Sequence, residues 1–111
     1  MTTYEYDALV ETTAIETVCH LIGSPIRMEI VRLLAASGET CTSEIMETLV
    51  LSRGCVVGHL KALAAANLAQ LRHATHPRGA GPITYWRLDV ERTLDLVDWL
   101  YDHISPSVSQ G

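Results

Sequence analysis

The sequence predicts a mainly α-helical single domain of about five helices with one β-hairpin near its C-terminal end. Three observations predict this fold class. Apolar residues recur at helical spacing over most of the chain, and HPRGAGP at 76–82 is the one Gly/Pro-rich interruption. The segments on either side of that interruption alternate as strands do. At 111 residues the chain is long enough for one core, so we expect one domain spanning 1–111.

The first two helices are predicted from apolar spacing and from their end signals. A helix over about 8–22 carries apolar residues on roughly one face and ends before a glycine. Ser24 is placed to cap the second helix, and Pro25 suits its first position because proline lacks an N–H group. Gly38 is the expected end of that helix.

Two further helices follow in quick succession. Thr42 or Ser43 is the expected cap of a short third helix, which has acidic residues in its first turns. Ser52 is the expected cap of a fourth helix, and Asn67 is its expected end. The two helices together have the lengths and spacing of a helix-turn-helix.

The remaining chain predicts a hairpin and a last helix. Residues 68–73 alternate, and ITYWRL at 83–88 is rich in β-branched and aromatic residues, which indicates two strands joined by a long loop. Apolar spacing resumes over about 90–104 and predicts the last helix. We expect 1–7 and 105–111 to be loose termini.

Basic residues gather in one stretch of this acidic chain. Residues 48–88 contain no Asp or Glu and carry +5, while the other 70 residues carry −10. The five basic residues are Arg53, Lys61, Arg72, Arg78 and Arg87. This acid-free stretch coincides with the fourth helix and the hairpin, so the expected fold is a winged helix-turn-helix. Because DNA is densely negative, a surface cleared of carboxylates predicts binding to double-stranded DNA.

The order of these elements resembles the ArsR/SmtB family of bacterial metal-responsive repressors across about 20–104. The matching residues are Ser52, Val56, His59-Leu60-Lys61 and Leu63 in the fourth helix and the return strand Tyr85-Trp86-Arg87-Leu88. The resemblance implies a homodimer, built from the first and last helices, that blocks operator DNA until an inducer weakens binding. It leaves any auxiliary protein partner unknown.

The apolar content of the last helix also predicts a dimer. This helix has more apolar surface than one small domain covers, since its recognition helices must face outward. The residues concerned are Leu96, Val97, Trp99 and Leu100.

The family resemblance places base reading at the start of the fourth helix, behind Ser52. Arg53 matches one reading position and is a suitable major-groove donor to guanine. Gly54, Val57 and Gly58 stand where the family often has Ser, Ser and His. We therefore expect close backbone approach, apolar contact and DNA shape to replace part of the hydrogen-bonded readout.

Other basic residues of the acid-free stretch are expected to contact phosphates rather than bases. These are Lys61, Arg72 and Arg78. A different class of function stays open, because Gly54 and Gly58 are also compatible with a protein-interaction module that has lost sequence reading.

A divalent transition metal ion such as nickel or zinc is the predicted inducer. In the family pattern His103 falls on the late histidine position of the last helix. Asp89 and Glu91 supply nearby oxygen donors, and we expect them to join His103 across the dimer. The other three family positions hold Val90, Arg92 and Pro106. The acids that continue along this helix are equally explained as a solvated face.

The cysteines offer a second, weaker metal site and a rival signal. Cys41 matches a thiolate position of the family, but Ser43 occupies the other position, and one thiolate cannot hold a soft metal alone. Cys19, Cys41 and Cys55 are otherwise expected to be small buried residues. A thiol-responsive repressor of the same fold is the alternative.

Several function classes are excluded by what the sequence lacks. It has no nucleotide-binding loop, no paired His/Cys zinc spacing and no recognisable nucleophile and base, so we expect no enzyme. No apolar run approaches the ~20 residues of a membrane span, and the acidic N-terminus has no secretory signal. The expected location is the cytoplasm.

Overall fold

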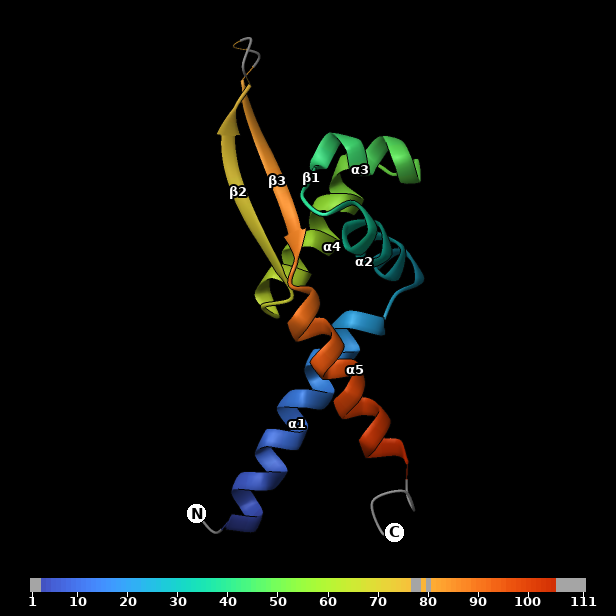
Figure 1. Ribbon diagram of the computed structural model, residues 1–111, viewed down its shortest axis with the longest axis vertical. Helices are drawn as coiled ribbons and strands as arrows, with labels where there is room; N and C mark the ends of the chain where they lie inside the picture. Colours follow the sequence, from blue (N-terminus) through green and yellow to red (C-terminus); the bar gives the residue numbers. More distant parts are fainter. Residues whose placement is uncertain (1–2, 77–78, 80, 106–111) are drawn as a thin grey trace.

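Five helices and three strands make up the described part of the chain and confirm the mainly α-helical winged helix-turn-helix (Figure 1). The computed structural model describes residues 3–76, 79 and 81–105, with side chains from residue 13 onward. In chain order the elements are α1 (Thr3–Ile22), α2 (Pro25–Ser37), β1 (Thr40–Cys41), α3 (Thr42–Leu49), α4 (Arg53–Ala65), β2 (Ala69–Thr75), β3 (Pro82–Leu88) and α5 (Val90–Ile104).

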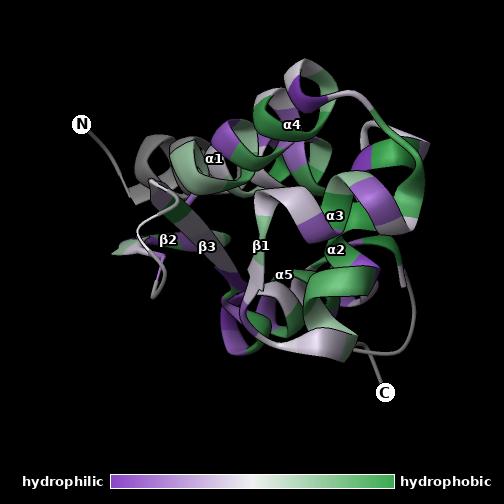
Figure 2. Cartoon of the chain, turned by 90° about the horizontal axis from the view of Figure 1, so that it is seen from above, coloured by the Kyte–Doolittle hydropathy of each residue, from purple (hydrophilic) through white to green (hydrophobic). Residues whose placement is uncertain are grey.

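The helices enclose one end of the sheet, and the hairpin extends away from them. Seen from above, α4, α3, α2 and α5 lie around β1 on three sides, and β2 and β3 leave on the fourth (Figure 2). At the opposite end of the molecule α1 and α5 cross and then diverge (Figure 1). The hairpin is therefore a wing at one end, and the first and last helices project at the other.

The sheet is antiparallel in the order β1-β3-β2 and has two unlike faces. Leu71 pairs with Trp86 on the inner face, which packs on the helices. Arg72 pairs with Tyr85 on the opposite, outer face, since neighbouring strand residues point to opposite sides. Strand β1 was not predicted, because two residues are too few to show alternation.

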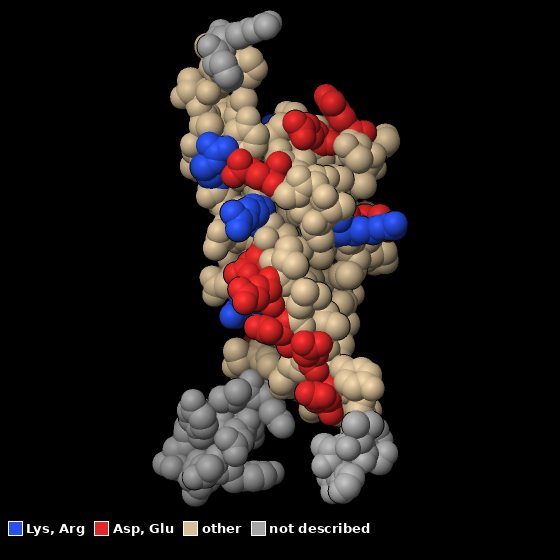
Figure 3. Space-filling model, in the orientation of Figure 1, with Lys and Arg blue, Asp and Glu red and all other residues tan. Residues whose placement is uncertain are grey.

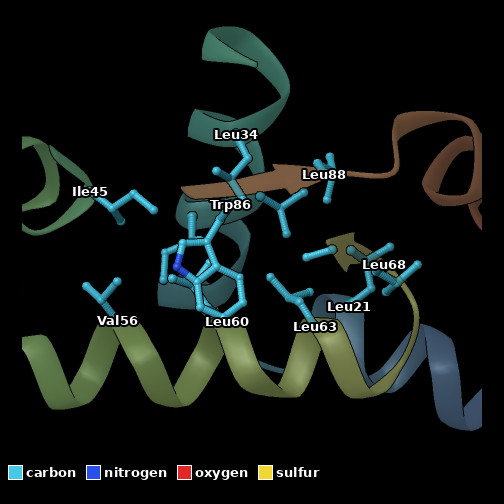
Figure 4. Packing of buried hydrophobic residues seen from close by; sticks show 12 residues of the cluster. Leu21, Leu34, Ile45, Val56, Leu60, Leu63, Leu68, Trp86 and Leu88 are labelled. Carbon is cyan, nitrogen blue, oxygen red and sulfur yellow. The ribbon is translucent and has the colours of Figure 1, made fainter. Parts of the chain in front are cut away.

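Trp86 joins the wing strand to the helix-turn-helix. Its side chain is only 4% exposed and lies among residues from α2, α3 and α4 (Figure 4). The indole Nε1 donates a 3.0 Å hydrogen bond to the Thr42 hydroxyl at the start of α3. The surrounding residues labelled in the figure include Leu34, Ile45, Val56 and Leu60. This packing fixes α4 relative to the sheet.

Most predicted helix ends are confirmed. The Ser24 hydroxyl accepts from the Arg27 N–H and Pro25 occupies the first turn of α2. The Ser52 hydroxyl accepts from the Cys55 N–H at 3.2 Å and so caps α4. Helix α4 ends at Ala65, and Asn67 follows two residues later. Asn67 has a φ of 61°, the left-handed conformation that asparagine tolerates.

Two predicted helix starts are wrong. Neither Thr42 nor Ser43 caps α3, whose N-cap is Cys41 without a side-chain hydrogen bond, because the Thr42 hydroxyl is used by Trp86. Helix α1 begins at Thr3, so residues 3–7 belong to the helix and are not part of a loose terminus. No Pro or Gly interrupts 3–22, and acids in the first turns favour a helix there. Residues 106–111 lie outside the described part.

Candidate nucleic-acid interface

Helix α4 divides into a buried face and an exposed, acid-free face. Val56, Leu60 and Leu63 are fully buried against the core. The exposed residues on the other side are Ser52, Arg53, Gly54, Gly58 and Lys61, and Val57 is half-buried beside them. Every residue predicted to read or contact DNA from this helix is therefore at least partly accessible, and the core holds the helix from behind.

The fold itself does not require the two glycines in α4. A Cβ atom built on Gly54 or Gly58 meets nothing within 4 Å. Each glycine inside a helix costs about 0.8–1.0 kcal/mol relative to alanine. The exposed face of α4 therefore lacks side chains at these two positions, although the packing of the chain does not require glycine there.

Arg72, which is predicted to contact phosphate, already has an acidic partner within the chain. Its guanidinium forms two hydrogen bonds with the Glu39 carboxylate, at 2.6 and 3.1 Å. It also lies over the Tyr85 ring, 4.7 Å from the centroid. These hydrogen bonds hold the pKa of Glu39 below its usual value and raise that of Arg72. Arg72 is thus engaged by an acid from outside the acid-free stretch.

The acid-free stretch is therefore not one surface. Arg72 and Arg87 share the outer face of the sheet, whereas α4 packs beneath the inner face. Sequence could not reveal Glu39 as a partner, because its contact depends on how β1 joins the sheet. Arg78, the other predicted phosphate contact of the wing, lies outside the described residues.

The face of the wing that is shared with Trp86 carries a polar pair. His73 and Thr84 are directly paired across β2 and β3, and His73 Nδ1 lies 3.1 Å from the Thr84 hydroxyl. Because side chains alternate along a strand, both lie on the face of Leu71 and Trp86. His73 is exposed there. On the side of the sheet where α4 packs, the wing thus presents imidazole and hydroxyl groups.

Arg27 links the recognition helix to the first two helices, a contact that the sequence analysis missed. Its Nε donates to His59 Nδ1 at 3.2 Å, and its Nη1 donates to the His20 carbonyl at 2.6 Å. Partial burial, together with the charge of Arg27, lowers the pKa of His59. The arginine bond requires a neutral imidazole, since Nδ1 acts as the acceptor.

The predicted metal ligands of α5 are not brought together within one chain. Asp89 and Glu91 lie at the start of the helix and His103 lies in its last turn, about 20 Å away at 1.5 Å per residue. His103 stacks on Trp99 with the ring centroids 4.8 Å apart. Among the described residues, no group of three or more His, Cys, Asp or Glu is suited to hold a metal ion. A site from these residues would need a second chain.

The cysteines are all free thiols with different exposures. Cys19 is exposed, which corrects the expectation that it is buried, because Val18 and Leu21 are the residues of this part of α1 that face the core. Cys41 and Cys55 are half-buried. No described His, Cys, Asp or Glu completes a metal site with Cys41.

The charges on α5 confirm an acidic stripe along one side of the helix. Figure 3 shows acidic groups that continue from the sheet along α5. The exposed members are Glu91, Asp95, Asp98 and Asp102.

Within the described ranges no single helix is long and apolar enough to span a membrane. Helices α3 and α4 reach that length and composition only when taken together, and the pair is bent by 118°.

Comparison with known proteins gives one family match. The model of the bacterial regulatory protein family arsR matches residues 24–70, which run from the cap of α2 through α4 to the start of β2. The family resemblance found in the sequence is thereby confirmed. No curated protein matches the chain.

Three solved structures share the fold. A transcriptional regulator homologue from Pyrococcus horikoshii OT3 has 22% identity and a TM-score of 0.58, covering 85% of this chain and 98% of its own. A "possible transcriptional regulatory protein" fragment from Mycobacterium bovis has 24% identity and a TM-score of 0.62, with coverages of 86% and 96%. A "possible transcriptional regulator" from Methanosarcina mazei Go1 has 14% identity and a TM-score of 0.58, with coverages of 86% and 85%.

Proposed function

With an ArsR-family helix-turn-helix as the premise, we propose that this chain is a transcriptional repressor that binds operator DNA as a homodimer through α4. The observation that carries the proposal is the exposed, acid-free face of α4, on which Arg53 and Lys61 are accessible. Its buried face is fixed to the core by Val56, Leu60 and Leu63. A rigid helix with one basic, accessible side suits the major groove.

Within this proposal the two bases of α4 have different tasks. Arg53 stands at the first position of the helix, where recognition helices present their base-reading side chains. Lys61 is two turns further along and contacts phosphate as a point charge. Gly54 and Gly58 allow the helix backbone to approach the groove closely.

The test is a titration of duplex DNA with salt and competitor as variables. We expect log affinity to fall linearly with log salt and the Lys61→Ala variant to lose about 0.9 from the slope for each phosphate contact removed. Arg92→Ala, an exposed base on α5, is the matched control and should keep the slope. If no duplex survives competition by bulk DNA, the chain is instead a protein-interaction module.

The proposed homodimer rests on an exposed apolar seam along α5. Its members follow a spacing of four and three residues and are between 43% and 66% exposed. They are Val90, Leu94, Val97, Tyr101 and Ile104. Such spacing is that of a helix seam that packs against another helix. Of the residues first expected here, Leu96 packs on the core, and Trp99 and Leu100 are half-buried.

Sedimentation of the purified chain tests the dimer. We expect a two-fold dimer at micromolar concentration and a monomer for Leu94→Glu, because a carboxylate in the seam would lose its hydration. Asp95→Asn changes the neighbouring acidic stripe and should leave the dimer intact. A folded wild-type monomer at that concentration contradicts the proposal.

The proposed inducer is a divalent ion, nickel or zinc, held by His103 with Asp89 or Glu91 of a second copy. The α5 seam supports this, since antiparallel packing of two such helices would bring the end of one near the start of the other. Metal titration should give two equivalent sites per dimer, which His103→Ala abolishes and Cys41→Ser retains. Equal affinity in the wild type and His103→Ala excludes this site.

A further inference from the structure

A small cavity lies where the end of α2, the root of the wing and the start of α5 meet. Its volume is about 280 Å³. Leu34 and Leu88, which are 1% and 4% exposed, belong to the core and are part of its apolar lining. Gln70, Arg87, Asp89 and Glu91 supply its polar lining. The junction of β3 with α5 thus builds one concave site together with β2 and the end of α2, which are distant from it in the sequence.

Opposite charges line this cavity without forming a direct ion pair with one another. The one ion pair within 4 Å in the described part of the chain joins Arg72 to Glu39, so Arg87 is not paired with Asp89 or Glu91. Figure 3 shows basic and acidic groups next to each other where the sheet meets α5. Arg87 and Gln70 are direct cross-strand partners, so both reach the cavity from the same side of the sheet.

Asp89 retains hydrogen-bonding capacity toward the cavity. Its Oδ1 accepts from the Arg92 N–H and caps α5, and its second carboxylate oxygen has no such bond in the described chain. A carboxylate has about four acceptor positions, so capping does not exhaust it. The cavity therefore offers a guanidinium and an amide on the strand side and two carboxylates on the helix side.

We propose that this cavity binds a free α-amino acid. Its carboxylate would be bound by Arg87 and Gln70, its ammonium group by Asp89 and Glu91, and its side chain would lie on Leu34 and Leu88. A ligand with both charges satisfies both sides of the cavity within one chain, where a bare divalent cation would face the positive charge of Arg87. The metal site proposed above uses the same acids only together with His103 of a second copy, so an amino acid and a metal ion would compete for them. The volume suits a small molecule, since it lies just under the common range for ligand pockets.

A ligand in this place would connect the dimer helix to the DNA-binding body. The cavity is bounded by α2 and β3 on one side and by the first residues of α5 on the other. Binding would therefore fix the angle at which α5 leaves the sheet. Ligand binding itself is independent of the proposed DNA binding and is measured without DNA.

Calorimetric titration with each of the standard L-amino acids tests the site. We expect saturable binding of at least one amino acid, with one site per chain, and no binding of its amide or its N-acetyl derivative. Arg87→Gln should weaken binding roughly tenfold or more, and so should Asp89→Asn, which keeps the helix cap while removing the charge. Arg92→Gln and Asp95→Asn, outside the cavity lining, are matched controls and should bind as the wild type does.

Three outcomes would overturn the inference. No heat from any amino acid at millimolar concentration excludes the ligand class. Binding that Arg87→Gln and Asp89→Asn leave unchanged places the ligand elsewhere. Nickel or zinc binding to the monomeric Leu94→Glu variant that Asp89→Asn and Glu91→Gln abolish and Arg87→Gln strengthens would assign these acids to a metal site within one chain instead.

Discussion

The recognition helix α4 and the wing belong to the same acid-free stretch of sequence, yet their basic residues stand in different surroundings. Arg53 and Lys61 on α4 are exposed and have no ion pair in the described structure. Arg72 on the wing is held by Glu39 and by the Tyr85 ring. A run of positive charge in a sequence therefore says which residues are basic, and the fold determines which of them are available to a ligand.

The difference has a structural cause. The two faces of the sheet point in opposite directions, and β1 brings the α2–β1 turn beside β3. Glu39 precedes β1 directly and so reaches the outer face, where Arg72 lies. Helix α4 lies behind the inner face and meets no acid from that turn. Arg72 of the wing is consequently a paired charge in the free protein, and Arg53 and Lys61 of α4 are not.

Replacing Trp86 should destabilise the wing and the recognition helix together. We expect Trp86→Ala to lower the free energy of unfolding by about 3–5 kcal/mol, because a buried indole supports the wing strand and α4 together. Thr42→Val, which removes only the acceptor of the indole N–H, should cost about 1–3 kcal/mol. Urea unfolding of both variants measures the two losses of free energy. Equal losses would mean that the hydrogen bond accounts for the whole effect and the packing of the indole for none of it.

Removing Arg53 should separate base reading from general attraction to DNA. Arg53→Ala is expected to cost about 1–3 kcal/mol on the preferred duplex and much less on random DNA. Arg72→Ala, made in parallel, should leave the ratio of the two affinities unchanged, since its side chain is on the outer face. Binding isotherms on both duplexes decide the matter. Equal losses on the two duplexes would remove Arg53 from the reading residues.

Releasing Arg72 from Glu39 should make its charge available to DNA, as the charges of Arg53 and Lys61 on α4 are. Glu39→Gln removes a carboxylate and frees the guanidinium, so affinity for any duplex should rise and the salt slope should steepen by about 0.9. The gain should be absent when Arg72→Ala is combined with it. An unchanged slope in Glu39→Gln would show that Arg72 does not reach a phosphate even when it is free.

Lowering the pH should affect the helix region through His59, with the smallest effect of the four. Its pKa is lowered in the folded chain by partial burial and by Arg27, so the unfolded chain takes up the proton first. Stability is therefore full above the unfolded pKa of about 6.5 and declines as the pH falls through the folded value. Thermal unfolding between neutral and mildly acidic pH should show a shallower decline for His59→Gln. An identical decline would assign the pH dependence to other groups.

Local signals in the sequence determined most of the secondary structure. Ser24, Pro25 and Ser52 act as helix-start residues, and they do so because capping involves atoms only a few positions apart. Apolar spacing likewise gave α5 over Val90–Ile104 and the two strands of the wing. Strand β1 and the helical start at Thr3 were missed, since a two-residue strand carries no period and the early turns of α1 have no strong apolar face.

The functional surface depended on contacts that no local pattern contains. Composition determined an acidic chain with one basic stretch, and the motif order determined an expected DNA-binding helix. Tertiary structure alone decided that Glu39 holds Arg72, that Arg27 joins α1 to α4, and that Arg87 shares a cavity with Asp89 and Glu91. The Glu39–Arg72 and Arg27–His59 contacts span 33 and 32 positions, and the cavity adds α2 to the junction of β3 with α5. They follow from sheet register and helix packing, which depend on the whole core rather than on neighbouring residues.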